Sequence, residues 1–170
     1  AGPLGAGEDN GQMSEHWPSA GYRALRRGRR SLPGQAYHVT TCTFRRAPVF
    51  ADSKCARAAC KVVAAPGSLG DGQLLAWVLM PDHLHLLLRL GSGTSLQSAV
   101  GRVKTRSAWA VRRASSLEGA VWASGFHDRA LRREEDLVTV ARYIVANPLR
   151  AGLVTRVGAY PYWDAVFLDG

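Results

Sequence analysis

The sequence lacks several features that mark secreted and membrane proteins. Its 170 residues include only three cysteines, and Cys42, Cys55 and Cys60 show no CxxC spacing, which argues against a disulfide framework. No run approaches eighteen consecutive apolar residues, and the N-terminus lacks the charged, apolar and small-residue order of a signal peptide. We therefore expect a soluble intracellular protein whose thiols stay reduced and buried.

Acidic residues are also scarce. The chain has 13 Asp and Glu against 22 Lys and Arg, a formal net charge of +9. A positive surplus of this size favours a polyanionic partner such as nucleic acid. The hydrophobic fraction of 46% over 170 residues is sufficient for one domain with a buried core, and the length is too small for two such domains.

The N-terminal part of the chain does not have the pattern of a packed element. Residues 1–12 are interpreted as a protease-cleavage scar and linker, with Met13 as the expected native start. Residues 13–34 are polar, contain the stretch YRALRRGRR, and are predicted to form a basic arm that contacts nucleic acid; a solvated tail is the alternative. The arm residues predicted to bind DNA are Tyr22, Arg23, Arg26, Arg27, Arg29 and Arg30.

Residues 35–170 are predicted to form a single α+β domain. The expected order is a strand at 35–46, a helix at 52–65, strands at 73–80 and 83–90, a helix from about 95 to 114, a short strand within 120–133, and a helix at 134–148. This order predicts a ferredoxin-like βαββαβ antiparallel sheet with helices on one face, plus a C-terminal helix. The second helix has a basic exposed side, and DNA binding is predicted for Arg102, Lys104 and Arg106.

The stretch MPDHLHLLLRL, residues 80–90, combines two histidines with a leucine-rich strand pattern. Because side chains alternate along a strand, His83 and His85 share one face while the leucines at even positions build the core on the other. Two imidazoles about 7 Å apart on one face can converge on a metal ion. By themselves they fit zinc, copper or simply two half-buried structural histidines.

The last predicted helix carries a second polar pair. Its apolar positions form one stripe, and Tyr143 and Asn147 lie one turn apart on the neighbouring stripe. A phenol at the border of the buried face could attack phosphorus, and an amide oxygen one turn away could complete a metal site. The ordinary alternatives are a tyrosine at the core edge and an asparagine that ends the helix before Pro148.

Three stretches together resemble a known family. MPDHLHLLL, with YHVTTCTF before it and ARYIVANPLRAGLV after it, is similar to the single-tyrosine HUH transposases, in particular the REP-associated tyrosine transposases, over about residues 22–163. The resemblance implies an HUH endonuclease fold that acts on single-stranded DNA with imperfect hairpins in the bacterial cytoplasm and nucleoid. It also implies His83 and His85 as the metal pair for Mg²⁺ or Mn²⁺, Tyr143 as the nucleophile and Asn147 as a third ligand.

The implied reaction is transesterification, in which Tyr143 forms a 5'-phosphotyrosine and a second strand can later be joined. A monomer is expected, with a dimer as the alternative. Three rival functions stay open: an inactive or domesticated hairpin-DNA-binding protein on the same fold, an unrelated zinc or copper enzyme, and an RNA-binding module. His38 and His127 are expected to have structural or DNA-contacting roles.

Overall fold

The computed structural model describes residues 31–132 and 135–167. The chain divides into two units, Ala1–Arg30 and Ser31–Gly170. The predictions for residues 1–12, and for the arm up to Arg30 with its six DNA-binding residues, therefore lie outside the described residues. Residues 31–34 are tied to the folded unit: the Gly34 amide donates to the Leu90 carbonyl at 2.8 Å, and the Leu96 amide donates to Ser31 Oγ at 3.0 Å.

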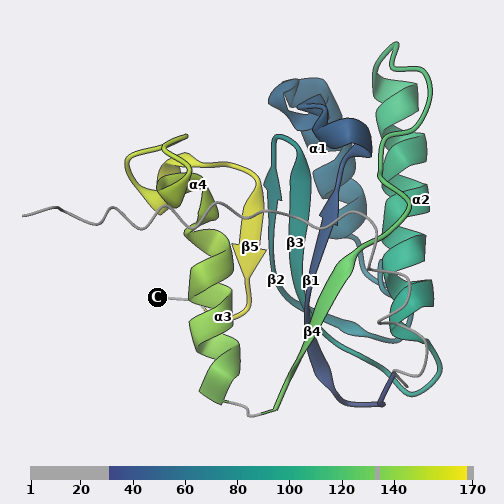
Figure 1. The fold of residues 1–170 in the computed structure, drawn as a ribbon, viewed down its shortest axis with the longest axis vertical. Coiled ribbons are helices and arrows are strands. Elements are labelled where there is room, and N and C mark those ends of the chain that lie inside the picture. The colour runs from purple at the N-terminus through teal and green to yellow at the C-terminus, as the bar shows by residue number, and fades with distance from the viewer. Residues whose placement is uncertain (1–30, 133–134, 168–170) are drawn as a thin grey trace, which may run out of the picture. The chain divides into compact units, whose positions relative to one another are not determined.

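The described unit is a mixed α+β fold around one antiparallel sheet (Figure 1). The strands are β1 (Ala36–Cys42), β2 (Gln73–Met80), β3 (His83–Arg89), β4 (His127–Leu131) and β5 (Trp163–Ala165). The helices are α1 (Ser53–Val63), α2 (Leu96–Ala114), α3 (Glu135–Val145) and α4 (Asn147–Arg150), with short 3-10 turns at Phe44–Arg46, Val49–Ala51 and Val157–Ala159. The strand order β4-β1-β3-β2-β5 places the histidine strand in the centre of the sheet.

The two faces of β3 belong to two separate cores. Leu84, Leu86 and Leu88 are fully buried in the core that α1 and α2 close. Leu87, on the histidine face, is equally buried in a second core built by α3 and β2. The alternation of side chains predicted from the sequence is therefore correct. The histidine face, expected to be free of helices, is partly covered, because α3 packs against β2, β3 and β5 (Figure 1).

Local side-chain contacts explain where α1 and α2 begin. Asp52 Oδ1 accepts hydrogen bonds from the amides of Lys54 and Cys55 at 2.7 and 3.0 Å, and Ser95 Oγ accepts one from the Ser98 amide at 3.1 Å. These bonds satisfy amides that have no partner within the first turn of a helix.

The last predicted helix is interrupted at its end. Instead of one helix over 134–148, α3 ends at Val145 and α4 begins at Asn147. Pro148 has no amide proton and so cannot bond to the Ile144 carbonyl four residues earlier. The side-chain amide of Asn147 supplies that bond, with Nδ2 donating to the Ile144 carbonyl at 3.0 Å and to the Tyr143 carbonyl at 3.2 Å.

Tyr160 fixes the C-terminal segment to the sheet: it is buried, and its hydroxyl donates to the Leu79 carbonyl at 2.7 Å. The strand β5 that follows was not predicted. It has three residues, and pairing with Ala76–Val78 of β2 holds it as an edge strand.

Candidate active site

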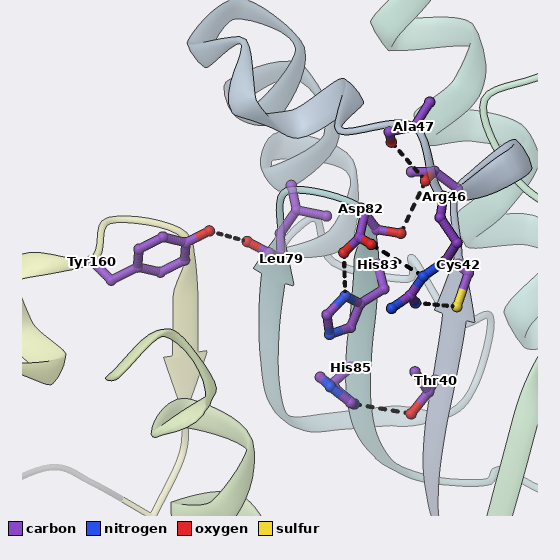
Figure 2. Close-up of polar contacts among 10 residues, drawn as sticks. Thr40, Cys42, Arg46, Ala47, Leu79, Asp82, His83, His85 and Tyr160 are labelled. Carbon is purple, nitrogen blue, oxygen red and sulfur yellow. Dashed lines mark hydrogen bonds and ion pairs between the residues drawn. The ribbon is translucent and has the colours of Figure 1, made fainter. Parts of the chain in front are cut away.

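The two histidines of β3 lie side by side on the sheet (Figure 2). Their ring centroids are 4.8 Å apart and the rings are nearly perpendicular, at 87°. In the β1–β3 register, Cys42 lies opposite His83 and Thr40 opposite His85, so side chains of β1 share this face. The predicted placement of both histidines on one face is therefore confirmed by the geometry.

Each histidine is oriented through the same ring nitrogen. Nδ1 of His83 lies 2.7 Å from Asp82 Oδ1, and Nδ1 of His85 lies 2.9 Å from Thr40 Oγ1 (Figure 2). A proton on Nδ1, donated to these oxygens, leaves the lone pair on Nε2 of each ring. Metal-binding histidines are oriented in this way, by a carboxylate or hydroxyl on the nitrogen that does not face the ion.

Asp82 is itself held by a turn that sequence analysis did not single out. Arg46 Nε lies 3.1 Å from Asp82 Oδ2, and Arg46 Nη1 donates to Cys42 Sγ at 2.9 Å. Arg45 and Arg46 both have left-handed backbone conformations, with φ of 53° and 57°. Two successive non-glycine residues in this region are energetically costly, and such strain is often found beside functional sites.

His38 connects the histidine pair to Tyr143. Its Nε2 lies 3.2 Å from Nδ1 of His85, and its ring centroid is 6.3 Å from that of Tyr143, edge to face. His38 was predicted to be structural or to contact DNA, and the structure places it inside the cluster. The sequence does contain a sign of this position. His38 and Thr40 are two residues apart on a strand, so their side chains lie on the same face of β1.

Tyr143 lies on the surface and not in the core. Its side chain is 46% exposed, and the guanidinium carbon of Arg150 lies 3.8 Å from the centre of its ring. Arg150 also donates from Nη1 to the Tyr143 carbonyl at 3.0 Å. The Tyr143 side chain is thus accessible, with its ring near that of His38 and beside the positive charge of Arg150.

Asn147, predicted as a third metal ligand, lies one helical turn after Tyr143. Its Nδ2 is used by the two helix carbonyls that it caps. The remaining atom, Oδ1, is an amide oxygen, which suits Mg²⁺ or Mn²⁺. Among residues 31–132 and 135–167, no three His, Cys, Asp or Glu side chains form a group that could hold a metal ion. A cation on the histidine pair would therefore take its further ligands from an amide, a phosphate or water.

Burial keeps the central imidazoles neutral. Burial, together with the positive charge of Arg129, lowers the pKa of His38 to about 4. Burial also lowers the pKa of His85 well below its usual value, and the neighbouring His83, His38, Arg150 and Arg46 act in the same direction. Both rings are therefore uncharged at neutral pH, which is the form that can bind a metal ion.

These shifts predict that the metal-free protein loses stability in mild acid. In the unfolded chain His38 takes up a proton near pH 6.5, whereas in the folded protein its pKa is about 4. The contribution of neutral His38 to the free energy of unfolding is therefore complete above pH 6.5 and is lost as the pH falls toward 4. We expect urea denaturation in EDTA to show that the free energy of unfolding falls between pH 7.5 and pH 5. His38 alone should account for about 2 kcal/mol of this decrease.

His38→Gln is the matched variant for this measurement, because glutamine keeps a polar side chain without a titrating group. Its unfolding free energy should fall less steeply over the same pH range, by the amount assigned to His38. An identical pH dependence in both proteins would show that His38 is not held neutral by the fold.

The predicted DNA-binding residues of α2 differ in their surroundings. Arg102 and Arg106 are exposed. Lys104 is bound to the loop before β4, where its Nζ donates to the carbonyls of Ala123 and Gly125 at 2.6 and 2.9 Å. His127 lies on β4 opposite Thr40, so the edge strand extends the same polar face. Their contacts with DNA stay predictions.

No helix within the described residues has the length and apolarity needed to cross a membrane.

The chain is similar in sequence and in fold to known transposases. The family model described as "Transposase IS200 like" matches residues 31–147. A curated Escherichia coli (strain K12) protein, the REP-associated tyrosine transposase, is 28% identical over 90 residues, which cover 53% of this chain and 52% of that protein. The chain thus spans about half the length of this curated relative. A solved structure of a REP-associated tyrosine transposase bound to a REP hairpin shares the fold, with a TM-score of 0.62, 24% identity and 79% coverage of each chain.

Proposed function

Because the chain belongs to the IS200-like transposase family, we propose that it is a single-tyrosine HUH endonuclease and strand transferase that acts on single-stranded DNA beside imperfect hairpins. The observation that carries this proposal is the cluster of His83, His85, His38 and the exposed phenol of Tyr143 on one face of the sheet. All four side chains come from one chain, which supports a site that works in a monomer. With a DNA substrate, its proposed place of action is the bacterial nucleoid.

The choice of hairpin DNA has two sources of support. The formal net charge of +9 favours a polyanion. The curated relative is named for its association with REP elements, and the solved neighbour is bound to a REP hairpin. We transfer this substrate class to the present chain as part of the proposal.

We propose that a divalent cation binds at the histidine pair. His83 and His85 would hold it through Nε2, Asn147 through Oδ1, and Asp82 and Thr40 would fix the two rings from behind. When bound, Mg²⁺ or Mn²⁺ polarises the scissile phosphate and stabilises the charge that develops on it. Because two imidazoles are unusual ligands for Mg²⁺, Mn²⁺ is the better probe in vitro.

The chemical step would belong to Tyr143. Its Oη attacks the phosphorus, the Oη–P bond forms, and the bond from phosphorus to the 3'-oxygen of the neighbouring nucleotide breaks. The phenolic proton leaves, and the 3'-oxygen gains a proton to become a free hydroxyl. The guanidinium of Arg150, directly over the phenol ring, supplies positive charge beside the attacked phosphate. Because the phosphotyrosine keeps the energy of the broken ester, another 3'-hydroxyl can reverse the step.

A covalent-adduct assay tests this function. The protein is incubated with Mn²⁺ and 5'-labelled or 3'-labelled single-stranded DNA that carries an imperfect hairpin from the flanks of its own gene. We expect a protease-sensitive protein–DNA adduct that retains the label on the 3' side of the cut. Hairpin binding without any adduct would instead support the rival function, an inactive hairpin-DNA-binding protein on the same fold.

A further inference from the structure

A second basic surface lies on the helices that cover the other face of the sheet. The helices α1 and α2 pack on the leucine side of β3, whereas His83 and His85 project from the opposite side. Between the outward sides of these helices runs a cleft of about 570 Å³. We call it the α1–α2 groove; its long side chains are Lys54, Arg57, Lys61, Arg106, Trp109 and Arg113.

The two helices that form the α1–α2 groove carry charge of one sign. The sequence of α1 contains three basic residues and that of α2 contains five, and neither contains an acidic residue. No ion pair within either helix can therefore neutralise these side chains, and their mutual repulsion is relieved most strongly by a bound polyanion. Small residues such as Ala58 and Ala110 line the groove between the long side chains, so a ligand can approach the helix backbones.

The long side chains of the groove form two matching stripes, one basic throughout and one with Trp109 between two arginines. Lys54, Arg57 and Lys61 follow one another at spacings of three and four along α1, and Arg106, Trp109 and Arg113 repeat the same spacings along α2. Residues at these spacings lie on one side of a helix. Each stripe is about 10 Å long at 1.5 Å per residue, which matches a short stretch of one nucleic-acid strand.

Trp109 distinguishes this groove from a simple charged patch. Its side chain is 60% exposed, and the Arg113 guanidinium carbon lies 4.8 Å from its ring centroid. An indole exposed to this degree between cationic side chains provides an aromatic surface on which an unpaired base can stack. In a duplex the faces of the bases are covered by their neighbours, so this surface favours a single strand.

We infer that the α1–α2 groove binds a single-stranded segment of nucleic acid, with its phosphates on the two basic stripes and one unpaired base on Trp109. The inference rests on the proposed function in that it names a second contact for the DNA substrate, away from the histidines. Its ligand is a strand that needs no hairpin. It requires neither the cation nor Tyr143.

Fluorescence anisotropy with a labelled 15-nucleotide oligothymidylate tests the groove, because this probe cannot form a hairpin. The full chain is titrated in EDTA at several NaCl concentrations. Trp109→Ala should raise the Kd about tenfold, and Trp109→Phe, which keeps a stacking ring, should stay within about twofold of the wild type. The double variant Arg57→Ala/Arg113→Ala should reduce the slope of log K against log salt by about 1.4, since each lost phosphate contact on a single strand contributes about 0.7.

Arg156→Ala is the matched control. Arg156 is exposed and adjoins Val157, which packs against the core on the α3 side of the sheet. Its loss should leave both the Kd and the salt slope unchanged. Circular dichroism melting of each variant verifies that the fold is retained.

Three results would overturn the inference: wild-type affinity in Trp109→Ala, equal losses in Trp109→Ala and Trp109→Phe, or displacement of the oligonucleotide by polyglutamate at the same charge concentration. The last result would indicate an acidic protein segment as the ligand. The covalent-adduct assay uses the wild-type protein and a different readout, so a failure of the groove and a failure of the proposed function can be told apart.

Discussion

Tyr143→Phe should abolish the covalent protein–DNA adduct while leaving DNA binding nearly unchanged. The substitution removes only the phenolic oxygen, and phenylalanine has no atom that can attack phosphorus. We expect adduct formation to fall by at least about 10³-fold, measured from the labelled band on a denaturing gel in Mn²⁺. Because this side chain is 46% exposed and its ring contacts Arg150 and His38, the phenylalanine ring should keep the local packing.

Tyr162→Phe is the control for this experiment. Tyr162 is half-buried, and its ring packs against that of Tyr160 with a centroid distance of 5.5 Å. Loss of that hydroxyl should leave adduct formation at the wild-type level. If the Tyr143→Phe protein still formed the adduct, the nucleophile would be another residue and the assignment would be wrong.

His83→Ala should produce the second large effect, on metal binding and cleavage together. His83 is more exposed than His85 and belongs to neither core, so its removal is less damaging to the fold. If the cation supplies several kcal/mol of charge stabilisation to the transition state, its loss slows cleavage by about 10³-fold. We expect EDTA to inhibit the wild type to the same degree and added Mn²⁺ to restore only the wild type.

A direct binding measurement separates this role from a structural one. The electron paramagnetic resonance signal of free Mn²⁺ should decrease when the wild-type protein is added and should persist with His83→Ala at the same concentration. Thermal melting in EDTA should give similar midpoints for the two proteins. Wild-type cleavage by His83→Ala in the presence of EDTA would contradict a metal-dependent site on this pair.

The structure also shows how the predicted site residues are held by residues that were not predicted to matter. Arg46 and Asp82 act on His83 through a turn whose backbone is left-handed at two positions. Nothing in the local pattern FRRAP indicates this turn, because its conformation depends on Thr43 Oγ1 donating toward the Ala47 and Asp82 carbonyls at 2.7 and 3.0 Å. The contact with Asp82 joins segments that are nearly forty residues apart in the chain.

Periodicity alone determined the directions of the main side chains. The alternation along 83–90 separates two imidazoles from a row of leucines, since a strand repeats every two residues. The helical spacing of Leu137, Val140, Ala141 and Ile144 buries that stripe and leaves Tyr143 at the surface. These directions follow from the backbone geometry of one element at a time, and the order of the elements was enough to predict the ferredoxin-like sheet.

Only the tertiary structure decided which elements meet at the site. The antiparallel register of β1 with β3 places Thr40 opposite His85 and His38 opposite Leu87, and it is this register that puts His38 between the histidine pair and Tyr143. The three-residue strand β5 and the break between α3 and α4 likewise depend on pairing with β2 and on the side chain of Asn147. Register and pairing arise from contacts between distant segments, and no pattern within a single segment specifies them.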